Sequence, residues 1–357
     1  MFRLLIGLIG VLLLIAAVGC QGRPDPTATS APTSVPEPTT APRVASAQGP
    51  GELVVYSGRS ESLVGPIIEQ FADATGIDVS VKYGSTSEIA ATILEEGANS
   101  PADIFFAQDP GGLAAVESMF ATLPNDVLSH VPANFRSPDG KWIGLSGRAR
   151  VIVYNTDRVS PGDLPSDLRG FTDPEWEGRI GWPPTNGSFQ AMVTAMRVIW
   201  GETETRAWLE GIQANNPQTY PKNTPTVAAA GAGEIDVGFV NHYYLYRFLA
   251  EEGEGFAARN AHLTGGGPGA MILVAGAGVL DGADNSENAI KFIEFMLSTV
   301  AQQYFAGSTY EYPLIEGVNV NRLLTPLADI NAPEVDMADL GDLEGTLDLL
   351  RDTGVLP

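Results

Sequence analysis

An alternation of strand and helix patterns over residues 52–108 is the feature that most constrains the fold of this chain. In order, it comprises the β-rich run ELVVYSG (52–58), apolar residues at helical spacing over 62–76, the period-two alternation IDVSVKY (77–83), a helical segment over 86–97 and the buried-type strand ADIFFAQ (102–108). Strands that alternate with helices in this way are typical of an α/β protein with a parallel sheet.

The alternation resumes beyond residue 141, which predicts two α/β lobes. We expect a strand pair within 141–155, strands at 178–184, 234–240 and 270–280, and helices within 188–214, 225–233, 242–253 and 287–307. Extended segments near 148–154 and 268–276 are the candidate crossings between lobes. We therefore assign 52–150 to a first lobe, 151–270 to a second lobe, 271–325 to a return to the first lobe and 326–357 to a C-terminal docking tail.

The first twenty residues predict export. Arg3 precedes an unbroken apolar run over residues 4–19, short for a spanning helix of roughly 20 residues, and then comes Cys20, the single cysteine of the chain. The ending AVGC resembles a bacterial lipobox, so we expect a signal peptide over 1–19 and lipidation of Cys20, with an uncleaved anchor as the alternative. The Pro, Thr and Ser content of 20–51 predicts a disordered tether. The body is thus expected outside the cytoplasm, anchored to the cell membrane as a lipoprotein.

Composition and motifs argue against nucleic-acid binding and against catalysis. A formal net charge of −23 repels phosphate backbones. The stretch GLSGR (144–148) lacks the last glycine of a nucleophile elbow, and GGGPG (265–269) lacks the Lys-Ser/Thr of a phosphate-binding loop. The sequence also has no His or Cys spacing suited to zinc. We therefore expect a binding protein rather than an enzyme.

Five junctions rich in small polar residues are candidate parts of a ligand site. They are YSGRSE (56–61), AQD (107–109), PTNGSF (184–189), KNTPT (222–226) and VNHYY (240–244). In open α/β sheets, ligands collect at the carboxyl ends of strands beside helix N-termini. Because the first two junctions belong to one expected lobe and the last three to the other, we expect a cleft that is lined from both sides.

Tyr243 and Tyr244 stand at the expected start of a helix. Neighbouring helical residues point about 100° apart, so the two phenols are not expected to share one core contact, yet both can swing around an object beyond the helix end. A phenol has a pKa near 10 and loses its proton at neutral pH only to a strong electrophile, for which ferric iron is the natural match. Ordinary half-buried aromatic packing is the alternative role for the pair.

Taken together, VNHYY, PTNGSF, KNTPT, SGRARVIVYNTD and TYEYPL (309–314) resemble the ferric-ion-binding proteins of bacterial iron-uptake ABC transporters. The resemblance covers nearly the whole body, from LVVYSG to EYPL. It implies a type II periplasmic-binding-protein fold with two hinged lobes that hold a ferric ion between them. It also implies delivery of the ion to an ABC permease in the cytoplasmic membrane, and we expect the protein to be a monomer.

Several residues acquire roles only through this resemblance. Tyr243 and Tyr244 match the two phenolate ligands. A synergistic anion, phosphate or carbonate, would be held by Asn186, Gly187, Ser188, Asn223 and Asn241, and Arg59 matches an anion-contacting arginine of the carbonate-binding members. Turn and helix-cap chemistry is the alternative role for these small polar residues.

The first lobe departs from the family pattern. Ser60 stands where some members have a histidine ligand, and Gln108 stands where they have a glutamate ligand. Glu61 occupies the place of a tyrosine found in other members. Gln108 and Glu61 are the candidate first-lobe metal ligands, with a solvent-facing acid in the first helical turn as the alternative for Glu61.

Three other functions compete with iron capture. The same fold could bind an oxyanionic solute such as a phosphonate or a phosphate ester, and this is the alternative function. An exported hydrolase would need a nucleophile, which the motifs do not provide. An adhesive or structural lipoprotein would show no ligand-dependent thermal shift, which tight binding must produce.

Overall fold

The computed structural model describes residues 50–357, and the predicted signal peptide, Cys20 and residues 20–49 of the tether lie outside this range. The first part of the described chain contains β1 (Glu52–Ser57), α1 (Glu61–Thr75), β2 (Asp78–Tyr83), α2 (Thr86–Glu96), β3 (Ile104–Ala107), α3 (Pro110–Ala115) and α4 (Asn125–Leu128). The middle part contains β4 (Ile143–Asn155), β5 (Ile180–Trp182), α5 (Gly187–Trp200), α6 (Glu202–Ala214), β6 (Gln218–Thr219), α7 (Asn223–Ala232), β7 (Val237–Asn241), α8 (Tyr243–Glu252) and β8 (Ala258–Ala261). The last part contains β9 (Ile272–Val279), α9 (Ser286–Met296), α10 (Thr299–Ser308) and α11 (Leu343–Asp352).

The strands form one mixed sheet in the order β2-β1-β3-β9-β4-β7-β5-β6, with β8 added on β4. The pairs β1–β2, β1–β3, β5–β6 and β5–β7 are parallel, whereas β9 and β4 pair antiparallel with all of their neighbours. The predicted α/β class is confirmed. The predicted parallel pairing holds toward the two ends of the sheet and is interrupted in the middle by β9 and β4.

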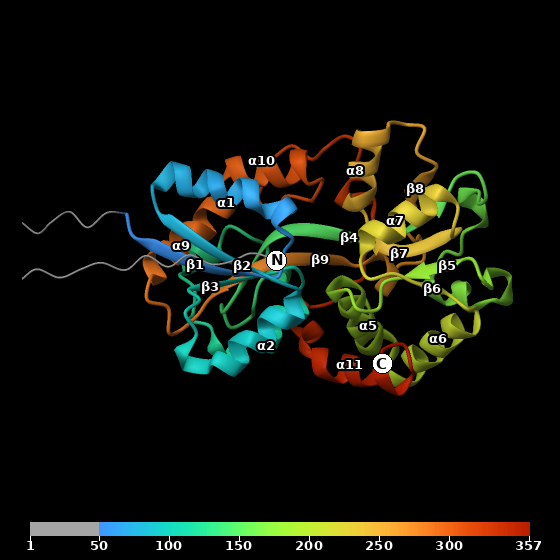
Figure 1. Ribbon diagram of the computed structural model, residues 1–357, viewed down its shortest axis with the longest axis horizontal. Coiled ribbons are helices and arrows are strands. Elements are labelled where there is room, and N and C mark those ends of the chain that lie inside the picture. The colour runs from blue at the N-terminus through green and yellow to red at the C-terminus, as the bar shows by residue number, and fades with distance from the viewer. Residues whose placement is uncertain (1–49) are drawn as a thin grey trace, which may run out of the picture. The chain divides into compact units, whose positions relative to one another are not determined.

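Strand β4 connects the two ends of the sheet. Its residues Ile143–Ala149 pair with β9, and Arg150–Tyr154 pair with β7. Figure 1 shows β4 and β9 side by side, with α1, α9 and α10 toward one end and α7 and α8 toward the other. We keep the names first lobe and second lobe for these two ends, and the exact lobe boundaries remain a prediction.

The predicted strand pair within 141–155 is wrong, since β4 is one continuous strand of 13 residues, buried along its length. Gly144 and Gly147 of this strand do not form a turn. They lie against close neighbouring residues. A Cβ at Gly144 would lie 2.7 Å from the carbonyl oxygen of Phe135, and a Cβ at Gly147 would lie 3.2 Å from the Cβ of Tyr312. A β-bulge between Gly144 and Ser146 shifts the register with β9.

The predicted helix over 287–307 is two helices. It is interrupted after α9, where Ser298 caps α10 by accepting a hydrogen bond from the backbone N–H of Ala301 at 3.3 Å. A serine in this position offers the backbone an alternative to continued helix.

Each end of the sheet has its own apolar packing. In the first lobe, Phe71 and Phe106 pack edge-on against Phe292 of α9. A second cluster gathers around β5, β7, α5 and α6, and α11 adds Leu349 and Leu350 to it. Within residues 50–357, no helix combines the length and the apolar character that crossing a membrane would require.

Candidate functional site

A cavity of about 600 Å³ lies between the two lobes. Its lining comes from residues 58–61, 83–86, 88 and 108 of the first lobe and from residues 185–187, 221–222 and 244 of the second. Each of the five predicted junctions therefore contributes to one cavity. They meet because the parallel strands of each lobe direct their carboxyl ends, and the helices that follow, toward the other lobe.

The two tyrosines begin α8 directly after β7 and His242. Tyr243 is fully buried, and Tyr244 is 7% exposed and lines the cavity. Their rings stack, with centroids 4.2 Å apart and planes 29° from parallel. The expectation that the two phenols diverge without a shared contact is thus wrong. The first two helical residues have no preceding turn to restrict their side chains, so both can rotate to the same side.

The hydroxyl of Tyr243 is buried without a hydrogen-bond partner among the described residues. Burial, and then the neighbouring Tyr244, raise the pKa of Tyr243 well above that of an ordinary phenol, while Arg148 and Arg59 act in the opposite direction. Tyr243 is therefore protonated at neutral pH in the absence of a strong electrophile. An unpartnered buried hydroxyl is costly, which makes this oxygen a candidate ligand atom.

Three buried arginines surround the tyrosines, namely Arg59, Arg148 and Arg150. Arg150 donates from Nη1 to Asn241 Oδ1 at 2.9 Å, whereas its Nε and Nη2 have no partner among the described residues. Burial, and then the charge of Arg148, lower the pKa of Arg150 to about 9, so it remains a cation at neutral pH. Positive charge at this place favours the ionised form of the Tyr243 phenol.

Sequence reasoning gave no role to Arg148 and Arg150. The stretch SGRARVIVYN could have indicated a shared role for the two arginines, because residues two apart in a strand lie on the same face. Two arginines on one face of an otherwise apolar strand are expensive to bury without an anion nearby.

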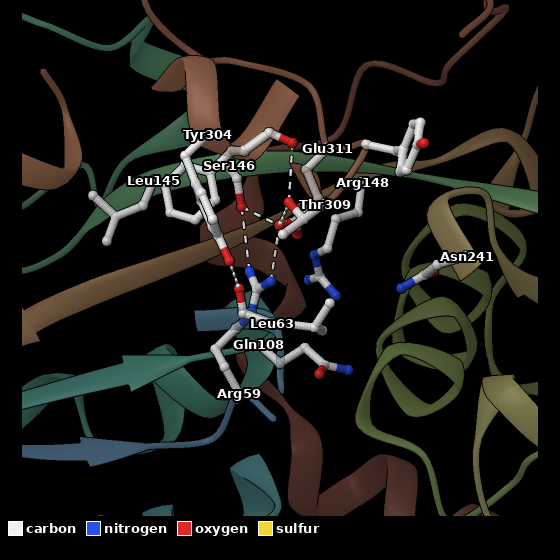
Figure 2. Close-up of polar contacts among 12 residues, drawn as sticks. Arg59, Leu63, Gln108, Leu145, Ser146, Arg148, Asn241, Tyr304, Thr309 and Glu311 are labelled. Carbon is white, nitrogen blue, oxygen red and sulfur yellow. Dashed lines mark hydrogen bonds and ion pairs between the residues drawn. The ribbon is translucent and has the colours of Figure 1, made fainter. Parts of the chain in front are cut away.

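Glu311 compensates one of these charges. Its carboxylate accepts from Arg59 Nη2 at 2.9 Å, from Thr309 Oγ1 at 2.9 Å and from Ser146 Oγ at 3.2 Å, as Figure 2 shows. Burial alone would raise the pKa of Glu311, but the charges of Arg59 and Arg148, with the hydrogen bonds, lower it overall. Arg59, predicted to contact an anion, thus lies at the cavity with part of its guanidinium engaged by Glu311.

Three hydrogen-bond donors lie within reach of the hydroxyl oxygen of Ser188. Arg148 Nη1 and Asn241 Nδ2 each lie 3.0 Å from Ser188 Oγ, and Gln108 Nε2 lies 3.2 Å from it. Figure 2 shows the side chains of Arg148, Asn241 and Gln108 directed toward a common space. A hydroxyl oxygen offers two lone pairs, so three donors exceed what it can accept well and would suit a more electron-rich oxygen.

The other predicted anion-binding residues also come together. Asn186 is the N-cap of α5, and its Oδ1 accepts from Ser188 N and from Asn223 Nδ2, each at 3.1 Å. Asn223 and Asn241 are fully buried. The structure therefore gathers Asn186, Ser188, Asn223 and Asn241 in one place, with their donors engaged by one another.

The predicted site residues of the first lobe are less engaged in hydrogen bonds. Ser60 and Glu61 are exposed at the start of α1, and Ser60 makes no capping hydrogen bond through its side chain. Gln108 is buried, lines the cavity and donates through Nε2 to Ser188 Oγ. Within residues 50–357, no group of three or more His, Cys, Asp or Glu could hold a metal.

His242 has a structural role that sequence reasoning missed. It is buried, its Nδ1 accepts from the backbone N–H of Ala149 at 3.0 Å, and its Nε2 donates to the carbonyl oxygen of Tyr310 at 2.7 Å. Burial lowers the pKa of His242 to about 4, so the ring is neutral. It fastens the start of α8 to β4 and to the segment that carries Glu311.

Comparisons with known proteins show the family to which this chain is similar. A model of the family described as bacterial extracellular solute-binding protein matches residues 98–338. The Fe(3+)-binding periplasmic protein of Serratia marcescens is 33% identical over 310 residues, covering 85% of this chain and 90% of that protein. Iron-bound HitA from Pseudomonas aeruginosa superposes with a TM-score of 0.82 at 34% identity, covering 85% of this chain and 99% of that one.

A third comparison includes a small anion. The Trichodesmium protein IdiA (FutA), solved in complex with iron and citrate ligands, has a TM-score of 0.73 at 29% identity and covers 85% of this chain and 99% of that one. The predicted periplasmic-binding-protein fold is confirmed by these structures, and the extracellular character of the family agrees with a position outside the cytoplasm. The chain belongs to the bacterial extracellular solute-binding protein family, whose members bind solutes rather than catalyse reactions, and it resembles the members that are named for ferric iron.

Proposed function

We propose that this protein captures ferric iron outside the cytoplasm, with Tyr243 and Tyr244 as phenolate ligands. The observation that carries the proposal is the unpartnered hydroxyl of Tyr243 among buried arginines. The ring of Tyr243 stacks on that of Tyr244, which lines the cavity. Ferric iron is a hard cation that favours anionic oxygen ligands. Arg148 and Arg59 make ionisation of the Tyr243 phenol easier, and the similarity to ferric-iron-binding proteins supports the same cargo.

The rest of the coordination shell is proposed to come from the first lobe and from a synergistic anion. Glu61 and Gln108 Oε1 are the candidate protein donors. Phosphate or carbonate would be held by Asn186, Gly187, Ser188, Asn223, Asn241 and Arg59. The citrate of the Trichodesmium protein supports a small anion beside the iron in a protein of this fold.

The lobes are proposed to close on the ion by hinge motion about the crossing strands. A membrane permease of the ABC type would then open them and accept the ion. Lipidation of Cys20 would keep the protein close to that permease, and the protein is proposed to act as a monomer.

Addition of ferric nitrilotriacetate to the iron-free protein tests the proposal. We expect a visible tyrosinate-to-iron charge-transfer band that saturates at one iron per chain and is lost in Tyr243→Phe and in Tyr244→Phe. Persistence of the band and of the affinity in both variants would contradict the assignment.

Calorimetry separates this function from capture of an oxyanionic solute. Tight binding of a phosphonate or phosphate ester to the iron-free protein, with no charge-transfer band on addition of iron, would favour the alternative. Tight iron binding with weak binding of organic phosphates favours iron capture.

A further inference from the structure

Asp109 makes an unexplained contact between the lobes. Its Oδ1 caps α3 by accepting from the backbone N–H of Gly112 at 3.1 Å. Its Oδ2 has no hydrogen-bond partner within residues 50–357, although Asp109 is only 2% exposed. That oxygen faces Gly187, the first residue of α5 in the second lobe, where an added Cβ would lie 2.5 Å from it. A helix cap needs only one of the two oxygens, so capping does not account for Oδ2.

The other end of this contact is suited to an anion. Helix α5 has 14 residues, and its N-terminus carries the partial positive charge of the helix dipole. The same turn, Asn186 to Ser188, is the proposed anion-binding loop. A buried carboxyl oxygen lies beside this turn, although it accepts no hydrogen bond from the backbone N–H groups of α5. An incoming anion would be stabilised by these N–H groups.

Gln108, the residue before Asp109, makes a second contact with the same loop. Its Nε2 donates to Ser188 Oγ at 3.2 Å, across the same interface between lobes. Two consecutive first-lobe residues therefore lie against the loop that would hold a free anion, Gln108 through a hydrogen bond and Asp109 through a close approach to Gly187.

We propose that Gln108 and Asp109 are a built-in substitute for the anion, which holds the lobes together while the site is empty. An incoming phosphate must displace Asp109 from the start of α5 before it can bind there. The identity of the loop rests on the proposed function, whereas the contact between the lobes does not.

Gly187→Ala tests the contact sterically. The backbone of Gly187 is not in the left-handed region, so alanine suits the helix start, and only the approach of Asp109 opposes its Cβ. We expect a larger radius of gyration for the iron-free variant in solution X-ray scattering. Adding Asp109→Ser, which keeps a capping oxygen but removes the second one, should restore the parent value. Gly162→Ala, where an added Cβ meets no atom within 4 Å, is the control.

Phosphate binding tests the displacement. Asp109→Asn keeps the cap and removes the charge, so we expect the iron-free variant to bind inorganic phosphate about tenfold more tightly than the parent, because like charges no longer meet at the loop. Asp126→Asn, a change at an exposed acid in the first turn of α4, should leave the affinity unchanged.

Equal or weaker phosphate binding by Asp109→Asn would overturn the proposal. So would an unchanged radius of gyration in Gly187→Ala, or no reversal in the double variant. Neither readout uses iron. If both give the expected results while ferric iron produces no charge-transfer band, the proposed function fails and this inference stands.

Discussion

The two sides of the cavity differ in burial and in charge. The tyrosine side (Tyr243, Tyr244, Arg150 and Asn241) is buried and held by hydrogen bonds, stacking and cationic neighbours. The first-lobe side (Arg59, Ser60, Glu61 and Gln108) has two exposed residues, one buried amide and one buried arginine that is paired with Glu311. A preformed side can bind a cation before the lobes approach each other, because its groups lose little freedom on binding. We infer that most of the iron-binding free energy resides on the tyrosine side.

The largest expected effect is that of Tyr243→Phe on iron binding. Loss of an outer-shell partner of a metal costs about 10–100-fold in affinity, and loss of a direct ligand should exceed that range. The iron-free variant should be at least as stable as the parent, because the removed hydroxyl has no hydrogen-bond partner in the part of the chain that the structure describes. Titration with ferric nitrilotriacetate and urea unfolding measure the two quantities.

The matched control is Tyr246→Phe. Its hydroxyl donates to the carbonyl oxygen of Leu323 at 3.0 Å. This variant should lose about 1 kcal/mol of stability and keep its iron affinity. The reverse pattern, with iron binding weakened only in Tyr246→Phe, would remove the basis for distinguishing the two sides.

Glu311→Gln should produce the largest loss of stability. Removing one partner of a buried ion pair costs roughly 3–5 kcal/mol, since Arg59 stays buried without its carboxylate. Glu254→Gln is the control, because the Arg259–Glu254 pair has a largely exposed carboxylate and should matter little. Similar midpoints for both variants in urea unfolding would show that the Arg59–Glu311 pair does not stabilise the first-lobe side.

The stability of the iron-free protein should fall on acidification through His242. Burial lowers its pKa from 6.5 to about 4, so between these values the unfolded chain binds more protons than the folded one. Stability is therefore unaffected by this group above pH 6.5 and decreases as the pH falls toward 4, by up to roughly 3 kcal/mol.

Urea unfolding at several pH values, compared with His242→Gln, measures this slope. The variant should be less stable at neutral pH and should lose most of the dependence. His262→Gln is the control for a second, half-buried histidine whose pKa is also lowered by burial. An unchanged slope in His242→Gln would exclude His242 as the titrating group.

The smallest effect is expected for Glu61→Gln. If the exposed carboxylate joins the shell only after closure, its loss should weaken iron binding about tenfold, the equivalent of 1.4 kcal/mol. Glu88→Gln alters another exposed acid of the same cavity and should change the affinity less than about twofold. If Glu61→Gln and Glu88→Gln weaken iron binding equally, Glu61 acts through the negative charge of the cavity and is not a metal ligand.

Local patterns predicted the positions of the elements, but not the contacts that depend on two lobes meeting. The start of α8 at Tyr243 followed from apolar spacing after a strand, and the structure places it there. The stacking of Tyr243 on Tyr244 did not follow, because side-chain directions at a free helix end are set by surrounding packing. The contact of Asp109 with Gly187 joins residues from different lobes, and no spacing in the sequence relates them.

The position of the buried arginines could be predicted only in part from the sequence. The alternation in β4 places Arg148 and Arg150 on one face, but only the structure shows that this face is turned toward Tyr243 and Ser188 rather than toward solvent. The boundaries of the lobes, the lipid anchor and the anion remain predictions.

Ultraviolet difference spectroscopy of phenol ionisation during iron titration tests the central claim most directly, because it counts the tyrosinates formed per ferric ion. With Tyr243 protonated in the iron-free protein, the predicted result is two new tyrosinates per bound iron, falling to one in Tyr243→Phe at iron concentrations high enough to load that variant. Iron that binds tightly without ionising any tyrosine would contradict the account.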